Sequence, residues 1–172
     1  MSVSLYDLSV GSYVQIVDAS IGFIAKGAEH AEAQGQSQDE LTQLRLIDDM
    51  ANFIFQVECI GHHSLGAIRG AQAGEFAPPP GLGEVSYADL QAYLDNTAAE
   101  LKALTEDEVN GLAGGRLVFK LGGNEIPFSV ENFLLSFSLP NFYFHATTAY
   151  DLLRANGVQL GKMNFLGQLK MG

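Results

Sequence analysis

The sequence has little cysteine, little positive charge and no long uncharged apolar run, and each shortage excludes a class of protein. Cys59 is the one cysteine among 172 residues, so an internal disulfide is excluded and a reducing compartment is expected. The 9 basic residues are scattered singly against 20 acidic ones, which gives a formal net charge of −11. Nucleic acids and anionic membrane surfaces are bound through basic patches. Neither is therefore an expected partner.

Features of export and of membrane insertion are also missing. The N-terminal segment "MSVSLYDLSV" has no basic region and carries Asp7, which is unlike a secretory signal. No run reaches the roughly 18 to 20 uncharged apolar residues that span a bilayer. We therefore expect a cytoplasmic protein. Its 172 residues, 47% of them hydrophobic, suffice for a single domain, residues 1–172, with its own core.

Helical periodicity is what the sequence has in abundance. Over residues 10–33, apolar side chains recur at steps of three and four, which is the spacing of one helix face. The same reasoning, with capping-box spacing at the first residues, predicts a second helical stretch over residues 37–71 and a third over residues 86–104. A fourth is predicted over residues 130–156, broken or kinked near Pro140.

The segment "RLVFKLGGNEIPFSV" interrupts the helices. Two short β-rich runs flank Gly122-Gly123-Asn124, a combination that predicts a β-hairpin. Pro127 restricts its strand to an edge of the sheet. Residues 70–83, with three consecutive prolines, are predicted to be a linker. The fold class that follows is mainly all-α: a four-helix bundle with a short β-hairpin inserted before the last helix.

Two stretches, "LPNFYFHATTAYDLLRANGV" and "RLIDDM", resemble an uncharacterised family, a domain of unknown function related to the DinB-like (DinB/YfiT) superfamily. The resemblance extends over nearly the whole chain in helix order and hairpin position. It implies a DinB-like four-helix bundle that is usually a homodimer. In better-known relatives it also implies a divalent metal ion held by three histidines. One of these lies on the second helix, and a His-x-x-x-His pair lies on the fourth, followed by Leu-Arg and Gly.

Placed on that pattern, this sequence keeps its end but departs from it at two ligand positions. The closing Leu-Arg and Gly are present within residues 153–157, and His145 matches the second histidine of the pair. Asn141 stands where the first histidine is expected, and the position on the second helix falls near Asp48 or Asp49. The resemblance therefore implies that the three-histidine site is absent and that at best an Asp-Asn-His set remains.

His145 shares a predicted helix face with Phe142, so we expect it to be buried. A buried histidine is either a neutral core residue with one hydrogen bond, a pocket residue or a metal ligand. Asn141, one turn away, either bonds to the imidazole or caps the helix. Asp49 either pairs with Arg45 along its own helix or faces His145 and fixes its tautomer.

Three other chemistry-bearing residues are interpreted as structural. Cys59 lies in "FQVECIGHH", which is predicted to be helical, so a buried inert thiol is favoured over a reactive one. His62 and His63 are adjacent on that helix, and adjacent side chains point about a quarter turn or more apart. They cannot both hold one ion from the same helix, and no second metal set is expected.

Two functions remain. The first is a dimeric DinB-like protein without a cofactor, which binds a small molecule in a cleft lined by five candidates: His145, Asn141, Asp49, Tyr143 and Tyr150. The alternative is a metal-dependent thiol transferase or hydrolase, in which His145 binds a divalent metal and Asp49 is a second ligand or a general base. The aromatic residues in "NFIF", "NFLLSF" and "NFYF" also favour a homodimer, because one bundle of this size has little room to bury them all.

Overall fold

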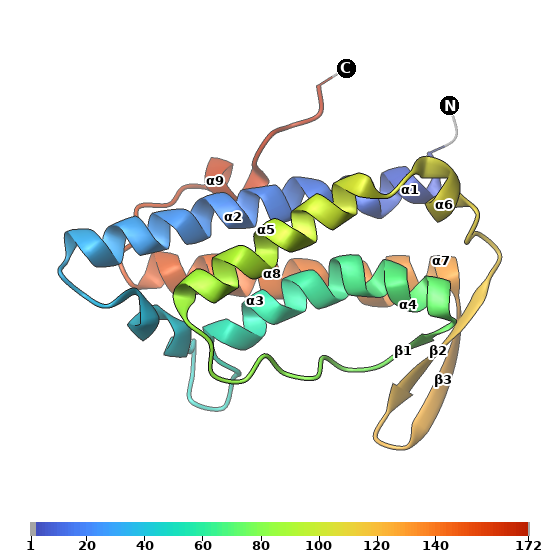
Figure 1. The fold of residues 1–172 in the computed structure, drawn as a ribbon, viewed down its shortest axis with the longest axis horizontal. Helices are drawn as coiled ribbons and strands as arrows, with labels where there is room; N and C mark the ends of the chain where they lie inside the picture. Colours follow the sequence, from blue (N-terminus) through green and yellow to red (C-terminus); the bar gives the residue numbers. More distant parts are fainter. Residues whose placement is uncertain (1–2, 172) are drawn as a thin grey trace.

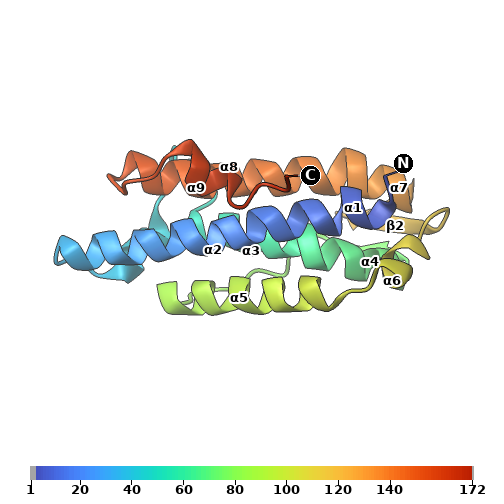
Figure 2. The same cartoon turned by 90° about the horizontal axis from the view of Figure 1, so that it is seen from above.

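The fold is described from a computed structural model, which covers residues 3–171. The chain is mainly α-helical, as predicted, and its long helical segments lie side by side (Figure 1). α2 contacts α5 and α8, and α3 contacts the same two helices from the other side. Seen from above, α2 therefore lies between α8 and α5 (Figure 2). The bounds of these helices are α2 Val10–Ala33, α3 Phe53–Gly61, α5 Tyr87–Ala103 and α8 Leu139–Ala155.

The second helical segment begins at Ser37 as predicted, but it is not one regular helix. Residues 37–71 were expected to be continuous, but an irregular stretch over residues 44–52 divides them. Asn52 restarts the helix, because its side-chain oxygen accepts the backbone N–H of Phe55 at 3.3 Å and so acts as the N-cap. The elements in order are the 3-10 helix η1 Gln38–Gln43, then α3, the π-helix η2 His62–Gly66 and α4 Ala67–Ala73.

The fourth helical segment carries the predicted interruption near Pro140 as a second π-helix. Its elements are α7 Val130–Asn132, the π-helix η3 Phe133–Ser138 and then α8. Pro140 lies in the first turn of α8, directly after η3. Because proline has no backbone N–H, it cannot continue the hydrogen bonds of the preceding turn, and the interruption falls at this point. A π-turn frees backbone groups and is frequent at functional sites. Here two π-turns occur in the two segments that lie against each other, α3–η2 and η3–α8.

The two π-turns are joined by hydrogen bonds. The Ser138 hydroxyl donates to the carbonyl oxygen of His63 at 2.6 Å. Since its only proton is used in that bond, the Tyr13 hydroxyl is the donor to Ser138 Oγ at 2.7 Å. All three residues are buried. This chain of bonds fixes η2 against η3 and ties both to α2.

The predicted hairpin is present, and it belongs to a slightly larger sheet. β2 (Arg116–Leu121) pairs antiparallel with β3 (Asn124–Ser129), and Val118 lies opposite Pro127. β3 is an edge strand, as Pro127 requires. A two-residue strand, β1 (Glu75–Phe76), pairs parallel with β2 inside the region predicted to be a linker.

Short helices complete the described chain, and one helical run has the composition of a membrane span. The short helices are α1 Leu5–Leu8, α6 Glu106–Asn110 and α9 Lys162–Leu166. The run Leu5–Ala33 has a mean hydropathy of 1.4 over its most apolar window, and 56% of that window is buried. Tyr13, Phe23 and Ile24 on α2 are fully buried in the core. A helix that packs one face into the core of its domain has this kind of composition.

Candidate functional site

His145 meets two further potential metal ligands in the interior between α8 and the α3–η2 segment. Cys59 and His63 are four residues apart, so they lie on one face of their helical segment. One ligand atom from each of Cys59, His63 and His145 lies within 4.8 Å of the other two. The three residues are 1%, 6% and 9% exposed. The structure thus brings a thiol and two imidazoles together where the core is closed.

Gln56 determines which nitrogen of His145 carries the proton. The Gln56 amide nitrogen donates to the carbonyl oxygen of Ala51 at 3.0 Å, so the amide oxygen is directed at His145. That oxygen lies 2.7 Å from Nδ1 of His145. An amide oxygen only accepts, so Nδ1 is protonated and Nε2 keeps a free lone pair. A hydrogen bond on one ring nitrogen is the usual means of orienting a histidine that binds a metal through the other.

Burial keeps all three side chains neutral. It lowers the pKa of His145 to about 4. Burial, together with the neighbouring His62 and His145, lowers the pKa of His63 to about 3. Burial, with the Glu58 carboxylate, raises the pKa of the Cys59 thiol to about 12. Both imidazoles are therefore neutral at pH 7, as metal ligands must be, and the thiol has to lose its proton when a cation binds.

The Nδ1 atom of His63 has no hydrogen-bond partner. Among the residues that the structure describes, it is the buried side-chain nitrogen or oxygen atom left without one. The ring is stacked on that of His145, with centroids 5.8 Å apart and planes 7° apart. The rings of Phe76 and Phe137 flank it, each with its centroid 5.7 Å away. Leaving a polar atom unpaired in such surroundings costs about 1–3 kcal/mol.

The donor set suits a soft or borderline divalent cation. One sulfur and two imidazole nitrogens form a ligand combination found at zinc, and three protein ligands leave one tetrahedral position open. Ligands on a tetrahedral zinc ion lie roughly 3.5 Å apart. The separations here, within 4.8 Å, therefore require side-chain adjustments on the order of 1 Å. The residues present fit such an ion.

Asp49 does not approach this site. It is exposed in the irregular stretch over residues 44–52 rather than on a helix. Arg45 donates to the carbonyl oxygen of Met50, and no ion pair joins Arg45 to Asp49 in the described chain. The role proposed for Asp49, fixing the tautomer of His145, belongs to Gln56. The cause is the early end of η1, which takes "RLIDDM" off the predicted helix.

The other residues predicted to line a cleft with His145 also lie away from it or form other contacts. Asn141 is half-buried within α8, and its amide donates to the carbonyl oxygen of Phe137 at 2.7 Å. It therefore neither bonds to His145 nor caps the helix. Tyr143 is 39% exposed, and Tyr150 lines a separate hollow beside α9. The five residues predicted to line one cleft do not converge, and His145 is the one that lies at the candidate metal site.

The comparisons agree with this architecture. The family model described as "Domain of unknown function (DUF1993)" matches residues 5–166. The chain belongs to the DUF1993 family. It is also similar to the crystal structure of a DinB family member protein from Shewanella denitrificans, with a TM-score of 0.81 and 26% sequence identity over 98% of this chain and 94% of that chain. No curated protein matches the chain. The predicted relation to an uncharacterised DinB-like family is confirmed.

The signal that could have revealed the site in this DUF1993 chain was Cys-x-x-x-His within the second helical stretch. His62 and His63 cannot share an ion, as argued from their adjacency, and the structure separates their roles. His62 is half-buried, and its Nε2 lies 2.8 Å from the carbonyl oxygen of Ala77. His63 instead shares a face with Cys59, one turn earlier. The pair that shares a helix face is therefore Cys59 and His63, four residues apart, and not the adjacent histidines.

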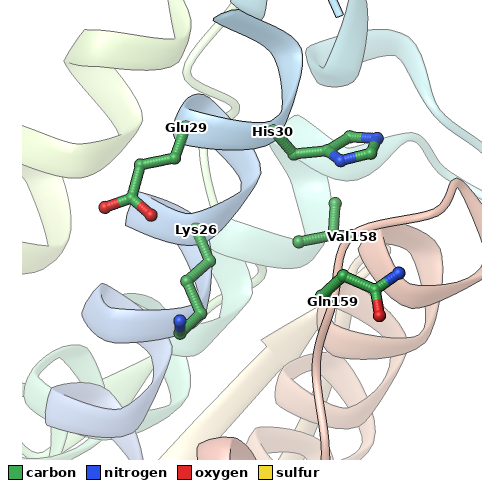
Figure 3. A pocket seen from close by; sticks show the side chains of 5 residues that line it. All are labelled: Lys26, Glu29, His30, Val158 and Gln159. Carbon is green, nitrogen blue, oxygen red and sulfur yellow. The ribbon is translucent and has the colours of Figure 1, made fainter. Parts of the chain in front are cut away.

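A surface hollow of about 230 Å³ near the end of α2 makes a weaker candidate (Figure 3). In Figure 3, Lys26 and Glu29 extend to one side, and His30 and Gln159 lie on the other. Val158 supplies an apolar side chain between the polar groups. Because the polar groups do not converge on one point, the hollow lacks the arrangement that fixes a ligand.

Proposed function

We propose that this DUF1993 protein binds a divalent metal ion, zinc first among them, through Cys59, His63 and His145. The observation that carries the proposal is the convergence of three ligand atoms within 4.8 Å inside a closed core. Such a set from two facing helical segments is also how metal sites are built in helical bundles. The unpaired Nδ1 of His63 supports it, because an ion would use a group that is otherwise costly to bury.

Each residue has a distinct part in holding the ion. Cys59 gives up its proton and contributes negative charge, and His145 binds through Nε2 while Gln56 holds Nδ1. His63 contributes the second imidazole, and the bond from Ser138 to its backbone carbonyl sets its position. Where an open fourth position is present, bound zinc acts as a Lewis acid and supports hydrolysis or group transfer. If zinc acts in this way, Cys59, His63 and His145 hold the ion and do not themselves act as acid or base.

The surroundings favour this function over a small-molecule cleft around His145. The rings of Phe55 and Phe144 stand edge-on to the His145 imidazole, with centroids 5.6 Å and 5.2 Å away. His145 itself is 9% exposed, so these rings and the core leave a small interior space beside the imidazole rather than an open cleft. A metal ion fits that space, and a substrate would have to pass the aromatic rings to reach it.

Metal content tests the proposal. The protein is produced without an affinity tag, purified without chelator, and analysed for manganese, iron, nickel and zinc by mass spectrometry. We expect close to one zinc ion per chain in the wild type and in His62→Gln and His30→Gln, the matched histidine controls. Cys59→Ser, His63→Gln and His145→Gln should each lose most of it. Cobalt-loaded wild type should also show a sulfur-to-cobalt charge-transfer band that Cys59→Ser lacks.

Circular dichroism of each variant separates loss of the ion from loss of the fold. The proposal fails if folded wild-type protein takes up no zinc or cobalt when either is supplied in excess. It fails equally if the three site variants retain as much metal as the two histidine controls.

A further inference from the structure

A second hollow lies between α8 and α9, away from the three metal-site residues. Its volume is about 370 Å³, and it is lined by Thr147, Tyr150, Asp151, Arg154, Lys162 and Phe165. We propose that it binds a small organic anion with a flat apolar body. Arg154 and Lys162 hold the carboxylate of the ligand, and its ring lies against Tyr150 and Phe165. This inference is independent of the proposed metal site.

Both walls of the hollow follow from helical spacing. Thr147, Tyr150, Asp151 and Arg154 stand three, four and seven residues along α8, so they share one face of the helix. Lys162 and Phe165, three apart, do the same on α9. α9 follows α8 in the sequence after a short connection. The hollow forms where these two helix faces oppose each other.

The connection between the helices holds α9 in place. Gly157 adopts a positive φ of 93°, which lets the chain turn back after α8. Val158 and Leu160 in the connection are buried at 3% and 5% exposure. At the far end of α9, the Gln15 side chain donates to the carbonyl oxygen of Leu166 at 2.8 Å. Both ends of α9 are therefore anchored to the rest of the domain, through the buried connection at one end and through α2 at the other.

The charges in the hollow are unusual for this protein. The chain has 9 basic against 20 acidic residues, yet Arg154 and Lys162 lie in the same hollow with Asp151 as the one acid. In the described chain, neither cation is within an ion pair, whereas Arg69 and Lys102 are paired with acids elsewhere. A C-terminal position on α8 suits Arg154, but Lys162 stands at the first residue of α9, where a helix does not favour a cation.

The aromatic side of the hollow defines the rest of the ligand. The rings of Tyr150 and Phe165 meet edge to face, with centroids 5.8 Å apart and planes at 72°. Both residues are half-buried, so part of each ring is open to a ligand. The volume is near the lower end of the range for ligand pockets, about 300–1,000 Å³. With two cations and one carboxylate lining the site, a singly charged carboxylate on a small ring system is the best match.

Titration with 2-naphthoate, followed by amide chemical shifts in nitrogen-15 NMR, tests this inference. We expect saturable shifts clustered on Thr147, Tyr150, Asp151 and Phe165. The uncharged analogue 2-naphthamide should bind at least roughly tenfold more weakly, because it lacks the charge that the two cations recognise. The spectrum of each variant also reports whether its fold is intact.

The double variant Arg154→Gln/Lys162→Gln removes both proposed carboxylate-binding cations, and it should weaken naphthoate binding at least roughly tenfold. Its control is Arg69→Gln/Lys102→Gln, which removes the same two positive charges from ion pairs elsewhere and should bind like the wild type. Absence of saturable shifts, shifts centred on other residues, or equal weakening in both double variants would overturn the proposal. Cys59→Ser should bind naphthoate normally, so failure here is distinguishable from failure of the metal site.

Discussion

Replacing Gln56 with leucine isolates the bond that orients His145. The substitution keeps a side chain of similar size in a position that is 2% exposed. It removes the acceptor that lies 2.7 Å from Nδ1 of His145. The imidazole N–H is then a buried donor without a partner, which costs about 1–3 kcal/mol. The bond from Gln56 to the Ala51 carbonyl is also lost, but Ala51 is half-buried and water can replace part of it.

The expected loss in the free energy of unfolding is therefore about 1–3 kcal/mol, reduced toward the lower figure by the burial of the apolar leucine. For a chain of this length, each kcal/mol lowers the melting temperature by about 2–4 °C. Chelator-treated protein must be used, so that any metal bound to His145 does not contribute. Urea and thermal unfolding then measure the change directly, with the exposed Gln72→Leu as the matched control.

A double-mutant cycle decides whether the loss comes from this pair. In a His145→Leu background the orphaned donor no longer exists, so Gln56→Leu should cost far less than in the wild type. The coupling expected between the two sites is about 1–2 kcal/mol. Equal costs in the two backgrounds would refute the assignment of the His145 tautomer to Gln56. In the metal-replete protein, Gln56→Leu should also weaken zinc binding by roughly 10- to 100-fold.

Two further predictions concern acid stability and assembly. Hydrogen bonds from the side chain and backbone of Ser86 lower the pKa of Asp89 below its usual value of 3.8, so its contribution to stability is present above that value and is lost as pH falls through the folded-state pKa. Melting temperatures measured from about pH 5 to about pH 2 should fall less in Asp89→Ala than in the wild type, and equal falls would contradict this. Leu135, Tyr143 and Phe144 on η3 and α8 are 42%, 39% and 56% exposed, and we expect a homodimer that buries them. Light scattering should give twice the chain mass of 18.5 kDa and a lower mass for Tyr143→Asp, whereas a single-chain mass at every concentration would exclude the dimer.

The sequence predicted the helices well where a regular apolar stripe and a stop signal coincide. The helix over residues 10–33 has the predicted bounds, and Gly35 beyond it adopts a positive φ of 68°. Ser37 also begins a helix as predicted, because its hydroxyl accepts the N–H of Asp39 at 3.3 Å. That helix is η1, which ends after six residues. A capping motif marks where a helix starts and carries no information about how far it continues.

Strand β1 could not be predicted from the sequence, for a different reason. It has two residues and pairs in parallel with a strand more than 40 positions later, through Glu75 opposite Val118 and Phe76 opposite Phe119. No local periodicity exists over two residues. What fixes this strand is burial of Phe76, whose ring packs edge-on to Phe133 with a centroid distance of 4.9 Å. Such a contact between distant parts of the chain can be seen only after the fold has formed.

The proposed metal site also could not be predicted from local patterns alone, although one sequence signal pointed to it. The resemblance placed a pair of ligands four residues apart on the fourth helix and a single ligand on the second, so the asparagine at 141 suggested that the site was lost. The structure places the four-residue pair, Cys59 and His63, on the second helical segment, and the single ligand, His145, on the fourth. A pair on one helix face and one residue from the facing helix define the same kind of interior point, whichever helix carries the pair. Loss of one member of a known pair is therefore no evidence against a site until the facing helix has been searched for a Cys or His pair at the same spacing.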